Sequence, residues 1–407
     1  MNILFLSTIF PDTSAPVTGP FNAALCRSLA QQHAVRVIAP RNWPDVARSF
    51  RSRQRMAPPQ DLTDTGVSID YPTYWYTPGF GRTAYGRFLW HSIRPTIKRV
   101  LREFTPDVVL SYWAHPDGEA GLEIARMAGV PCGVIVGGSD VLLLPEDARR
   151  AECVRSVLKD SDAVFTVSDH LREVVCQLGG KPEKTHTIRQ GIDPKVFRPG
   201  DRHAIRARLG EPLDRPLLLW VGRMVDVKNP VMLLQAARRL AEADFAFRLA
   251  LVGDGPLRAM LEAFVREHDL QDRVRFVGAV AQTELPDWYR AADVTLLSSH
   301  SEGLPNVLRE SLACGTPFVS TQVGSVPEIA ESQVSILVEP GNASALADGV
   351  ISVLHGRYAE AAERYRPRTW GECADHVAGL LQSLCGNTSP DPMPFAGVGA
   401  RQLVRQA

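Results

Sequence analysis

The sequence predicts an α/β protein built from two doubly wound parallel sheets that face a cleft. Its 407 residues exceed the size at which one hydrophobic core usually stops growing, so two domains are expected. Short apolar runs alternate with helical patterns in both halves, which is typical of parallel strands covered by helices. The runs lie at residues 2–7, 35–39, 107–113, 132–137 and 163–168, and then at 216–222, 247–253, 274–278, 293–299, 318–321 and 335–339.

The domain boundary is expected in residues 191–201, where "GIDPKVFRPGD" interrupts the periodicity with two prolines and two glycines. We therefore predict a first domain at 1–195 and a second at 196–368. A last helix is expected at 369–385. No strand follows it, so it can pack on either domain, and crossing back to the first is one option. Residues 386–407 are rich in glycine and proline and are expected to form a flexible tail.

The composition argues against several classes of function. With 45 basic and 45 acidic residues the formal net charge is zero, so bulk electrostatics does not favour nucleic acid as a partner. The seven cysteines contain no CxxC pair, which fits free thiols in a reducing compartment and not a metal site. The N-terminus lacks the pattern of a signal peptide, and no apolar run reaches about 18 residues. A cytoplasmic location is expected, with or without peripheral attachment to the inner face of the cell membrane.

Residues 41–86 lack clear periodicity and leave two interpretations open. The segment holds Arg48, Arg51, Arg53 and Arg55, followed by the aromatic stretch "YPTYWYTPGFGRTAYGR". It can be a solvated, mobile insertion. Alternatively, arginines beside aromatic rings can grip an acidic or lipid-linked acceptor at a membrane surface, which makes Arg51 and Arg53 candidate acceptor contacts.

Two loops of the second half follow strands directly and can face a phosphate-rich ligand. "GRMVDVKNP" (222–230) leads into a helix that starts near Pro230, so Arg223 and Lys228 would reach one polyanion while Gly222 allows close backbone approach. "GDGP" (253–256) ends the next strand and places Gly253 at the same edge. Alone, these motifs would be two surface cations and a structural turn. Because both motifs follow strands at the same edge of one sheet, together they favour a diphosphate site.

Three residues of the first half are predicted at the opposite side of the cleft. His115 in "SYWAHPDGEA" and Asp140 in "VGGSDV" each follow a strand, and Gly19 in "TGPFN" leads into a helix. A lone histidine is more often structural, but polar side chains at adjacent strand ends favour a site, and Asp140 is a candidate acceptor contact. The loop with Gly19 is not the GxGxxG fingerprint of nicotinamide-binding proteins.

The stretch "SHSEGLPNVLRESLACGTP" (299–317) carries two acids in different positions. A helix is predicted from about Pro305 to Ala313, so Glu302 lies on the loop at its mouth and Glu310 lies inside it. That spacing is too wide for a close catalytic dyad. The two carboxylates are therefore expected to accept hydrogen bonds from two parts of one elongated, hydroxyl-rich ligand.

In combination, these motifs resemble the retaining glycosyltransferases of family 4, which have the GT-B fold of two Rossmann-like domains. The matching elements are "GPF" (19–21), "GRMVDVKN" (222–229), "GDGP" (253–256), "RFVG" (275–278) and "EGLPNVLRE" (302–310). Each is weak alone, whereas their order and spacing are specific. "YWAHPDG" and "GGSD" are similar to enzymes of exopolysaccharide, teichuronic acid or lipopolysaccharide assembly.

The resemblance implies a nucleotide-sugar donor, UDP- or GDP-linked, bound mainly by the second domain, and a carbohydrate or lipid-linked acceptor on the side of the first. Arg223 and Lys228 would contact the diphosphate, Glu302 the transferred sugar and Glu310 the ribose. His115 would face the sugar from the first domain. The further donor contacts implied by position are Gly19, Gly222, Gly253, Phe276, Val277, Gly303, Leu304 and Pro305.

The resemblance implies that retention comes from attack of the acceptor hydroxyl on the same face of the sugar from which the leaving group departs. The sequence offers no obvious carboxylate nucleophile for a double displacement. No cofactor is expected, and since no DxD-type pair is well placed, neither is a catalytic metal. Two alternatives are a GT-B sugar-nucleotide epimerase and a non-catalytic protein that binds nucleotide-sugar or acceptor. The spaced glutamate pair argues against the epimerase, and the intact set of charged residues argues against a degenerate binder.

Overall fold

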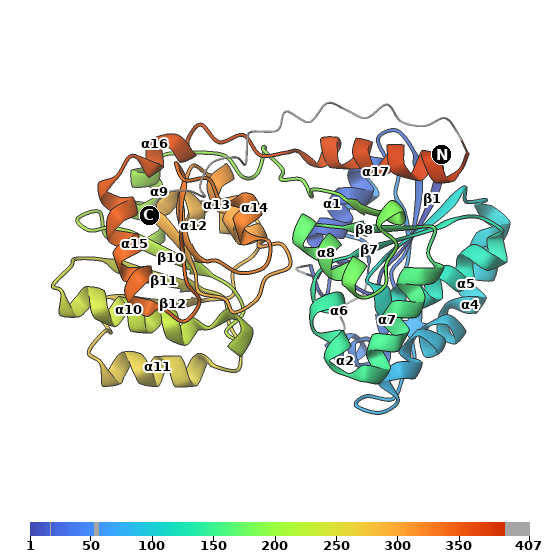
Figure 1. The fold of residues 1–407 in the computed structure, drawn as a ribbon, viewed down its shortest axis with the longest axis horizontal. Helices are drawn as coiled ribbons and strands as arrows, with labels where there is room; N and C mark the ends of the chain where they lie inside the picture. Colours follow the sequence, from blue (N-terminus) through green and yellow to red (C-terminus); the bar gives the residue numbers. More distant parts are fainter. Residues whose placement is uncertain (17, 53–56, 387–407) are drawn as a thin grey trace, which may run out of the picture.

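The computed structural model describes residues 1–16, 18–52 and 57–386 and shows two sheets, each covered by helices (Figure 1). The larger sheet has seven strands in the order β4-β2-β1-β6-β7-β8-β9, and the second has six in the order β12-β11-β10-β13-β14-β15. Every neighbouring pair in both sheets is parallel. The predicted fold class, two doubly wound α/β units, is confirmed.

The first sheet consists of β1 (Asn2–Leu6), β2 (Ala34–Ile38), β4 (Ser68–Asp70), β6 (Val108–Tyr112), β7 (Cys132–Val136), β8 (Ala163–Thr166) and β9 (Thr185–Thr187). The second consists of β10 (Leu217–Val221), β11 (Arg248–Val252), β12 (Val274–Gly278), β13 (Val294–Leu297), β14 (Phe318–Thr321) and β15 (Ser335–Val338). All eleven strands predicted from apolar runs are present. The apolar runs did not predict β4 and β9, which are three-residue strands at the two edges of the first sheet.

Helices connect these strands. In the first half they are α1 (Pro20–Leu29), α2 (Trp43–Ser52), α3 (Gln60–Thr63), α4 (Tyr85–Glu103), α5 (Glu119–Ala128), α6 (Ser139–Leu142), α7 (Ala148–Asp160) and α8 (Asp169–Gln177). In the second half they are α9 (Arg202–Leu209), α10 (Pro230–Glu242), α11 (Arg258–Glu267), α12 (Leu285–Ala291), α13 (Asn306–Ala313), α14 (Val326–Ile329), α15 (Ala343–His355), α16 (Tyr358–Ala362) and α17 (Trp370–Leu384). None of the described helices is long and apolar enough to span a bilayer.

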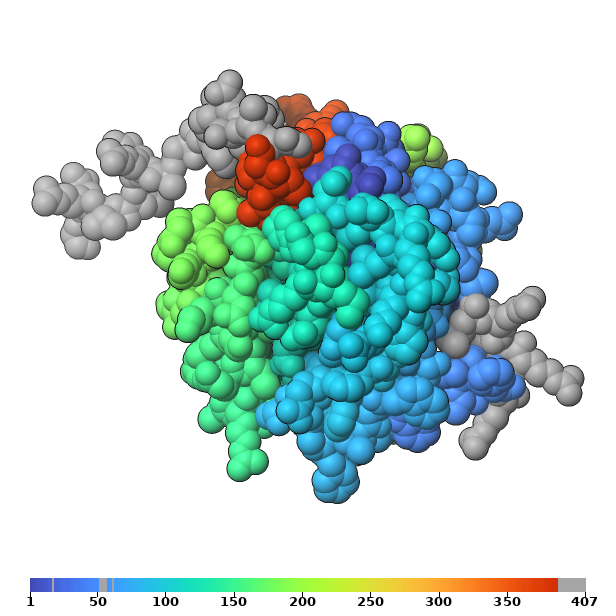
Figure 2. Space-filling view, turned by 90° about the vertical axis from the view of Figure 1, so that its right-hand side faces the viewer, coloured from blue at the N-terminus to red at the C-terminus, as the bar shows by residue number. Residues whose placement is uncertain are grey.

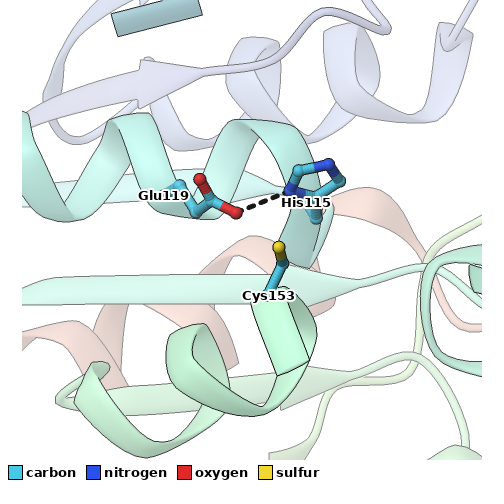
Figure 3. Close-up of side chains that lie close together, drawn as sticks. All are labelled: His115, Glu119 and Cys153. Carbon is cyan, nitrogen blue, oxygen red and sulfur yellow. Dashed lines mark hydrogen bonds and ion pairs between the residues drawn. The ribbon is translucent and has the colours of Figure 1, made fainter. Parts of the chain in front are cut away.

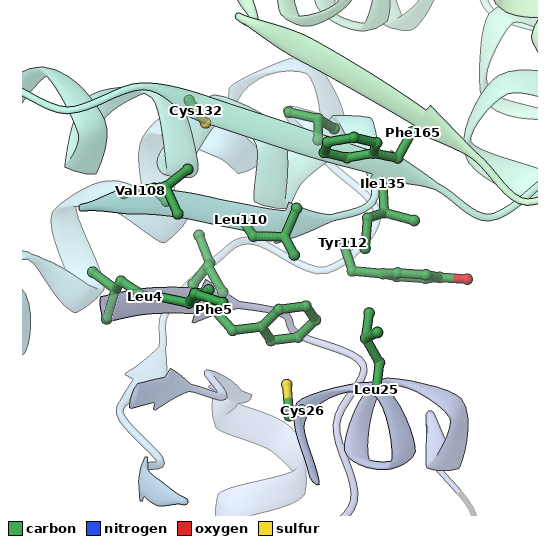
Figure 4. Packing of buried hydrophobic residues seen from close by; sticks show 14 of the residues in the cluster. Leu4, Phe5, Leu25, Cys26, Val108, Leu110, Tyr112, Cys132, Ile135 and Phe165 are labelled. Carbon is green, nitrogen blue, oxygen red and sulfur yellow. The ribbon is translucent and has the colours of Figure 1, made fainter. Parts of the chain in front are cut away.

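The central strands are continuous apolar segments because helices cover both of their faces. Every residue of β6 and β7 is buried. Figure 4 shows Phe5 of β1, Leu110 of β6, Ile135 of β7 and Phe165 of β8 packed in one layer of the first core, with Leu25 of α1 beside it. This packing fixes the strands whose carboxyl ends carry the candidate residues of the first domain.

Both sheets reverse their strand order next to their first strand. β1 lies between β2 and β6, and β10 lies between β11 and β13. In open parallel sheets, ligands bind beyond the carboxyl ends of the strands at such a reversal. The loops that carry Gly19 and Arg223 leave their sheets at these two places.

The chain crosses between the sheets twice, and the two crossings run side by side. Ile192 pairs in parallel with Thr369, and its N–H donates to the carbonyl of Arg368 at 2.8 Å. α17 then begins with a capping box formed by Thr369 and Glu372 and packs against α1. Figure 2 shows this helix, in red, beside the N-terminal segments in blue. The sequence left open where the last helix packs; it completes the core of the first sheet.

Residues 41–86 are more ordered than the expected irregular insertion. Beyond α2, α3 and β4, the segment forms a two-stranded parallel sheet of β3 (Arg41–Asn42) and β5 (Thr73–Tyr74) and a 3-10 turn, η1 (Arg82–Ala84). Short strands with no alternation of apolar and polar residues leave no periodic signal, which is why the sequence did not reveal them.

Candidate site in the cleft

The loop after β10 presents Arg223 and Lys228 at the strand-order reversal of the second sheet. Asn229 adopts a left-handed conformation with φ 43°, and its side-chain oxygen accepts a hydrogen bond from the N–H of Met232, so it caps α10. Pro230 occupies the first turn, as predicted. The Arg223 side chain is exposed and forms no ion pair with the described residues. It is therefore available to a ligand.

Lys228 forms an ion pair with Glu302 that joins two of the predicted site residues. Its Nζ donates to both carboxylate oxygens, at 2.6 and 2.8 Å. The hydroxyl of Ser299 donates to one of the same oxygens at 2.6 Å. The Glu302 side chain is only 6% exposed, whereas that of Lys228 is 28% exposed. The buried Glu302 carboxylate is thus paired with a lysine whose side chain is partly exposed.

Backbone contacts fasten the loops that carry this ion pair to each other. The N–H of His300 donates to the carbonyl of Val227 at 2.8 Å, and the Ser298 hydroxyl donates to the carbonyl of Lys228 at 3.0 Å. From the next strand, the Thr321 hydroxyl donates to the carbonyl of Ser299 at 2.7 Å. These hydrogen bonds form a backbone frame that holds the loops of Lys228 and Glu302 next to each other.

Two glycines allow further loops to touch this frame. A Cβ on Gly253 would lie 1.9 Å from the carbonyl oxygen of Gly222, and Gly253 has a φ of 130°. A Cβ on Gly324 would lie 1.9 Å from the carbonyl oxygen of Glu302, at a φ of 51°. Both contacts exclude any larger residue. In the absence of ligand, Gly253 supports the Gly222 loop, and contact with a donor stays a prediction.

Glu310 lies in α13, as predicted, and is held from the neighbouring helix. The hydroxyl of Tyr289, which is fully buried in α12, donates to one carboxylate oxygen at 2.9 Å. Burial raises the pKa of the Glu310 carboxyl from 4.5 to about 7, against the opposing effects of the Tyr289 hydrogen bond and of Arg309. Near neutral pH the group is therefore divided between its acid and carboxylate forms.

The other predicted donor contacts lie in both domains. Phe276 and Val277 end β12, and the Arg258 guanidinium lies 5.9 Å from the centre of the Phe276 ring. In the first domain, Gly19 precedes α1 with a φ of 63°, and a Cβ there would lie 2.3 Å from the carbonyl oxygen of Ile9. The loop after β1 is consequently folded tightly onto itself before the helix begins.

Asp140 has a different environment from the one expected of an acceptor contact. Its side chain is completely buried, and its oxygens accept from the backbone N–H groups of Ala114, Gly137 and Gly138 at 2.9–3.1 Å. Desolvation nevertheless raises the pKa of this carboxyl. Asp140 joins the loops after β6 and β7, and in this conformation an acceptor cannot reach it.

His115 is likewise turned into the first domain, contrary to the expectation that its ring faces the transferred sugar. The side chain is 1% exposed. Nδ1 lies 2.6 Å from a carboxylate oxygen of Glu119, and Nε2 lies 2.9 Å from the carbonyl oxygen of Arg82. Position at the end of a strand indicated the correct edge of the sheet but not the direction of the side chain.

The two remaining acceptor candidates cannot be placed. Arg53 lies outside the described residues. Arg51 is described only as part of the helical backbone of α2.

The two domains touch at the loop 303–305. The carbonyl oxygen of Gly303 accepts from the hydroxyl groups of Ser168, at 3.3 Å, and Ser325, at 2.5 Å. A Cβ on Gly138 would lie 3.1 Å from the Cα of Gly303, so only glycine lets these backbones meet without displacement. Leu304 lines an adjoining cavity of about 130 Å³ between the domains, together with Val167, Arg189, Gln190, Arg309, Glu328, Ile329, Glu331, Tyr365 and Arg368.

Glu328 makes a second contact between the domains that the sequence did not indicate. Its two carboxylate oxygens accept from the N–H groups of Asp169 and His170, at 2.9 and 2.8 Å, and so cap α8 of the first domain. A negative charge at a helix N-terminus is favourable. Glu328 follows β14 within "VGSVPE", so the rule that identified the other strand-end residues would have found it if applied there.

One group of side chains within the described ranges could hold a metal ion. The side chains that lie close enough to share an ion there are those of His115, Glu119 and Cys153. None of them belongs to the loops that carry Arg223, Lys228 and Glu302.

Two family models together match most of the chain. "Glycosyl transferases group 1" matches residues 201–369, and "Glycosyltransferase Family 4" matches residues 21–196. One relative is a protein of Bacillus subtilis (strain 168) named for teichuronic acid biosynthesis, glycosyltransferase TuaC; it is 28% identical over 363 residues, which cover 87% of this chain and 90% of TuaC. Another is D-inositol 3-phosphate glycosyltransferase 1 of Catenulispora acidiphila, 31% identical over 325 residues, which cover 70% of this chain and 77% of that protein.

Solved structures share the fold. Anabaena HepE in complex with UDP and glucose superposes with a TM-score of 0.71 at 18% identity, over 94% of this chain and 100% of HepE. Sucrose-phosphate synthase from Thermosynechococcus elongatus gives a TM-score of 0.78 at 21% identity, over 95% and 100% of the two chains.

The raised pKa of Glu310 predicts a pH dependence of stability. Below about pH 4.5 the carboxyl is protonated in both the folded and the unfolded chain. As pH rises toward 7, the unfolded chain ionises first, so the stability of the fold with the neutral, partly buried acid is lost between about 4.5 and 7. The free energy of unfolding should fall over this window by an amount on the order of 1–3 kcal/mol.

Urea unfolding of wild type and Glu310→Gln across this pH range measures the effect. The difference in stability between the two proteins should change with pH, because glutamine does not titrate. The exposed Glu339→Gln is the matched control and should follow wild type. A parallel pH profile for wild type and Glu310→Gln would contradict the assignment.

Proposed function

The chain belongs to the group 1 glycosyltransferases of family 4, with the GT-B fold, and we propose that it moves a sugar from a UDP- or GDP-sugar to a hydroxyl acceptor with retention of anomeric configuration. The observation that carries this proposal is the Lys228–Glu302 ion pair, whose lysine lies on the same loop as the exposed Arg223. It supplies cations for a diphosphate and a carboxylate for hydroxyl groups at one point of the cleft.

The diphosphate is proposed to bind between Arg223 and Lys228. A guanidinium can donate to two phosphate oxygens at once, and the ammonium acts as a compact positive charge beside them. As the bond between the sugar and the phosphate breaks, negative charge grows on the departing diphosphate. Fixed cations stabilise that charge with little reorganisation, so no metal ion is needed for this step.

Glu302 is proposed to hold the transferred sugar. Both of its oxygens accept from Lys228, and one also accepts from Ser299. A carboxylate offers about four acceptor positions, so hydrogen bonds from sugar hydroxyls can be added. Because Lys228 touches both groups, the carboxylate and the diphosphate would share one cation, which fixes the distance between the sugar and its leaving group.

Glu310 is proposed to accept hydrogen bonds from the ribose, with the base beside Phe276 and Val277 at the end of β12. The Tyr289 hydroxyl fixes one oxygen of Glu310, and the described residues provide no hydrogen bond to the other. In this arrangement the nucleoside lies along the second domain from β12 to α13, and the sugar lies near the loop 303–305 where the domains meet.

Retention is proposed to follow from attack on the face that the diphosphate leaves. The described part of the cleft around Glu302 holds that carboxylate in an ion pair with Lys228, which makes it a poor nucleophile. An oxygen of the departing diphosphate can instead take the proton of the acceptor hydroxyl. The acceptor is proposed to be a carbohydrate or lipid-linked carbohydrate of cell-surface polysaccharide or glycolipid assembly, which the similarity to TuaC supports.

Peripheral attachment to an anionic membrane is proposed to bring the protein to such an acceptor. Phe50 and Phe80 are each 79% exposed, and Trp75 is 61% exposed. Trp75 stacks on Trp43 at the start of α2, which connects the aromatic loop to that helix. Arg48, whose side chain is 75% exposed, lies on the same helix. Aromatic side chains beside arginine suit the interface of an anionic bilayer.

The donor is tested by thermal unfolding with UDP-, GDP- and ADP-sugars and with the free nucleoside diphosphates. A ligand at a hundredfold excess over its Kd stabilises the folded protein by about 2.7 kcal/mol. Either the UDP compounds or the GDP compounds should therefore raise Tm clearly. Arg223→Ala should lose most of that shift and about 10²–10³ in turnover. Arg239→Ala, another exposed arginine of the same domain, should behave as wild type. An unchanged Tm shift and turnover in Arg223→Ala would contradict the diphosphate assignment.

Membrane attachment is tested by co-sedimentation with vesicles that contain phosphatidylglycerol. Full burial of a phenylalanine side chain stabilises by about 1.5–3 kcal/mol, so Phe50→Ser combined with Phe80→Ser should weaken vesicle binding by more than about tenfold. Leu213→Ser replaces a residue of the second domain that is 54% exposed and should have no effect. Equal binding of all variants, or no binding of wild type, would exclude this surface.

A further inference from the structure

A cluster of three side chains in the first domain lies outside the proposed transfer site. His115 precedes α5, Glu119 is the first residue of α5, and Cys153 lies on α7 (Figure 3). One potential ligand atom from each residue lies within 4.8 Å of the other two. The three side chains converge beneath η1, whose carbonyl groups at Arg82 and Thr83 also face the cluster.

Both ring nitrogens of His115 face hydrogen-bond acceptors. Nε2 faces the carbonyl oxygen of Arg82, and Nδ1 faces a carboxylate oxygen of Glu119 only 2.6 Å away. Both partners are acceptors. A neutral imidazole has one N–H, so with Nε2 donating to Arg82 the lone pair of Nδ1 would point at a carboxylate. A cation bound by both Nδ1 and the Glu119 carboxylate would satisfy the two groups once their side chains move apart to make room for it.

The surroundings hold all three groups in place. Glu119 packs against the first turn of α4, where a Cβ on Gly86 would lie 1.9 Å from a carboxylate oxygen. The Cys153 thiol lies 3.5 Å from the carbonyl oxygen of Thr83. His115 is almost fully buried, whereas Glu119 is 23% exposed, so an ion and a water molecule can enter from the side of the carboxylate.

We propose that His115, Glu119 and Cys153 bind a divalent cation of the zinc class, through Nδ1, a carboxylate oxygen and the thiolate, with water as a fourth ligand. This mixture of imidazole, carboxylate and thiolate suits Zn²⁺ and does not suit Mg²⁺ or Ca²⁺, which prefer oxygen ligands alone. The Nε2–H that donates to the Arg82 carbonyl is the outer hydrogen bond that a zinc-bound histidine usually makes.

The proposed ion would connect elements that are distant in sequence. Its ligands come from the segment after β6 and from α7, and the outer hydrogen bond reaches η1, next to the aromatic segment of residues 71–80. A metal binds cysteine as the thiolate, so binding must release the proton of the Cys153 thiol. Zinc affinity should therefore increase with pH.

Cobalt substitution provides the test, because a thiolate bound to Co²⁺ gives a near-ultraviolet charge-transfer band. Protein stripped of metal with a chelator is titrated with Co²⁺ and then with Zn²⁺, and bound metal is measured after gel filtration. We expect one ion per chain and a charge-transfer band that Zn²⁺ abolishes. Cys153→Ser should remove the band and lower the affinity by more than about 100-fold, beyond the loss typical of outer hydrogen-bond partners.

Two further variants make the outcome decisive. Glu119→Gln should keep the band but bind metal more weakly, which separates loss of a ligand from loss of the fold. Cys176→Ser replaces another partly buried cysteine, on α8, and should match wild type. Absence of stoichiometric metal in wild type, or a band that survives Cys153→Ser, would overturn the proposal and leave a hydrogen bond between His115 and Glu119.

Discussion

The ion pair between Lys228 and Glu302 is the interaction on which the arrangement of the cleft depends. A carboxylate with 6% of its surface exposed is costly without a partner, and removing one member of such a pair typically costs about 3–5 kcal/mol when both are buried. Lys228 is more exposed, so the cost here is smaller. Backbone contacts nevertheless hold the pair in place. They connect four loops, at residues 222–230, 253–256, 298–305 and 321–325. Gly253 and Gly324 allow two of these contacts, which no larger residue would permit.

The contacts between these loops fix the positions of the charged groups in the cleft. A site that stabilises charge in a transition state is most effective when its charges are already fixed, because reorganisation during the reaction is costly. The frame orients Lys228 toward Glu302, and Arg223, which forms no ion pair within the described ranges, is exposed at the edge. The first domain then closes over the same place through Ser168 and Gly138 at Gly303 and through Glu328 at the start of α8. The loop 303–305 therefore takes part in both the domain contact and the site geometry.

The sequence predicted the fold and the edge of the sheet better than it predicted side-chain environments. Apolar runs located all strands of the second sheet, because buried parallel strands are continuously apolar. The positions of Arg223, Lys228 and Glu302 followed from the rule that ligands gather at carboxyl ends. Nothing in the sequence signalled that Lys228 and Glu302, 74 residues apart, would pair, or that Tyr289 would hold Glu310. His115 and Asp140 satisfy the same rule, yet their side chains point into the first domain, because the direction of a side chain depends on loop geometry that a sequence pattern does not contain.

The central claim is that Lys228 serves both a diphosphate and the carboxylate that holds the sugar. Calorimetric titration of UDP and GDP into wild type and Glu302→Gln, combined with turnover of the corresponding nucleotide-sugar, tests it most directly. The neutral isostere can still accept from Ser299 and Lys228, so the loop should keep its shape while Lys228 loses its competing anion. The account predicts that Glu302→Gln binds the nucleoside diphosphate at least as tightly as wild type and loses about 10² or more in turnover. Weakened diphosphate binding with turnover preserved would contradict it.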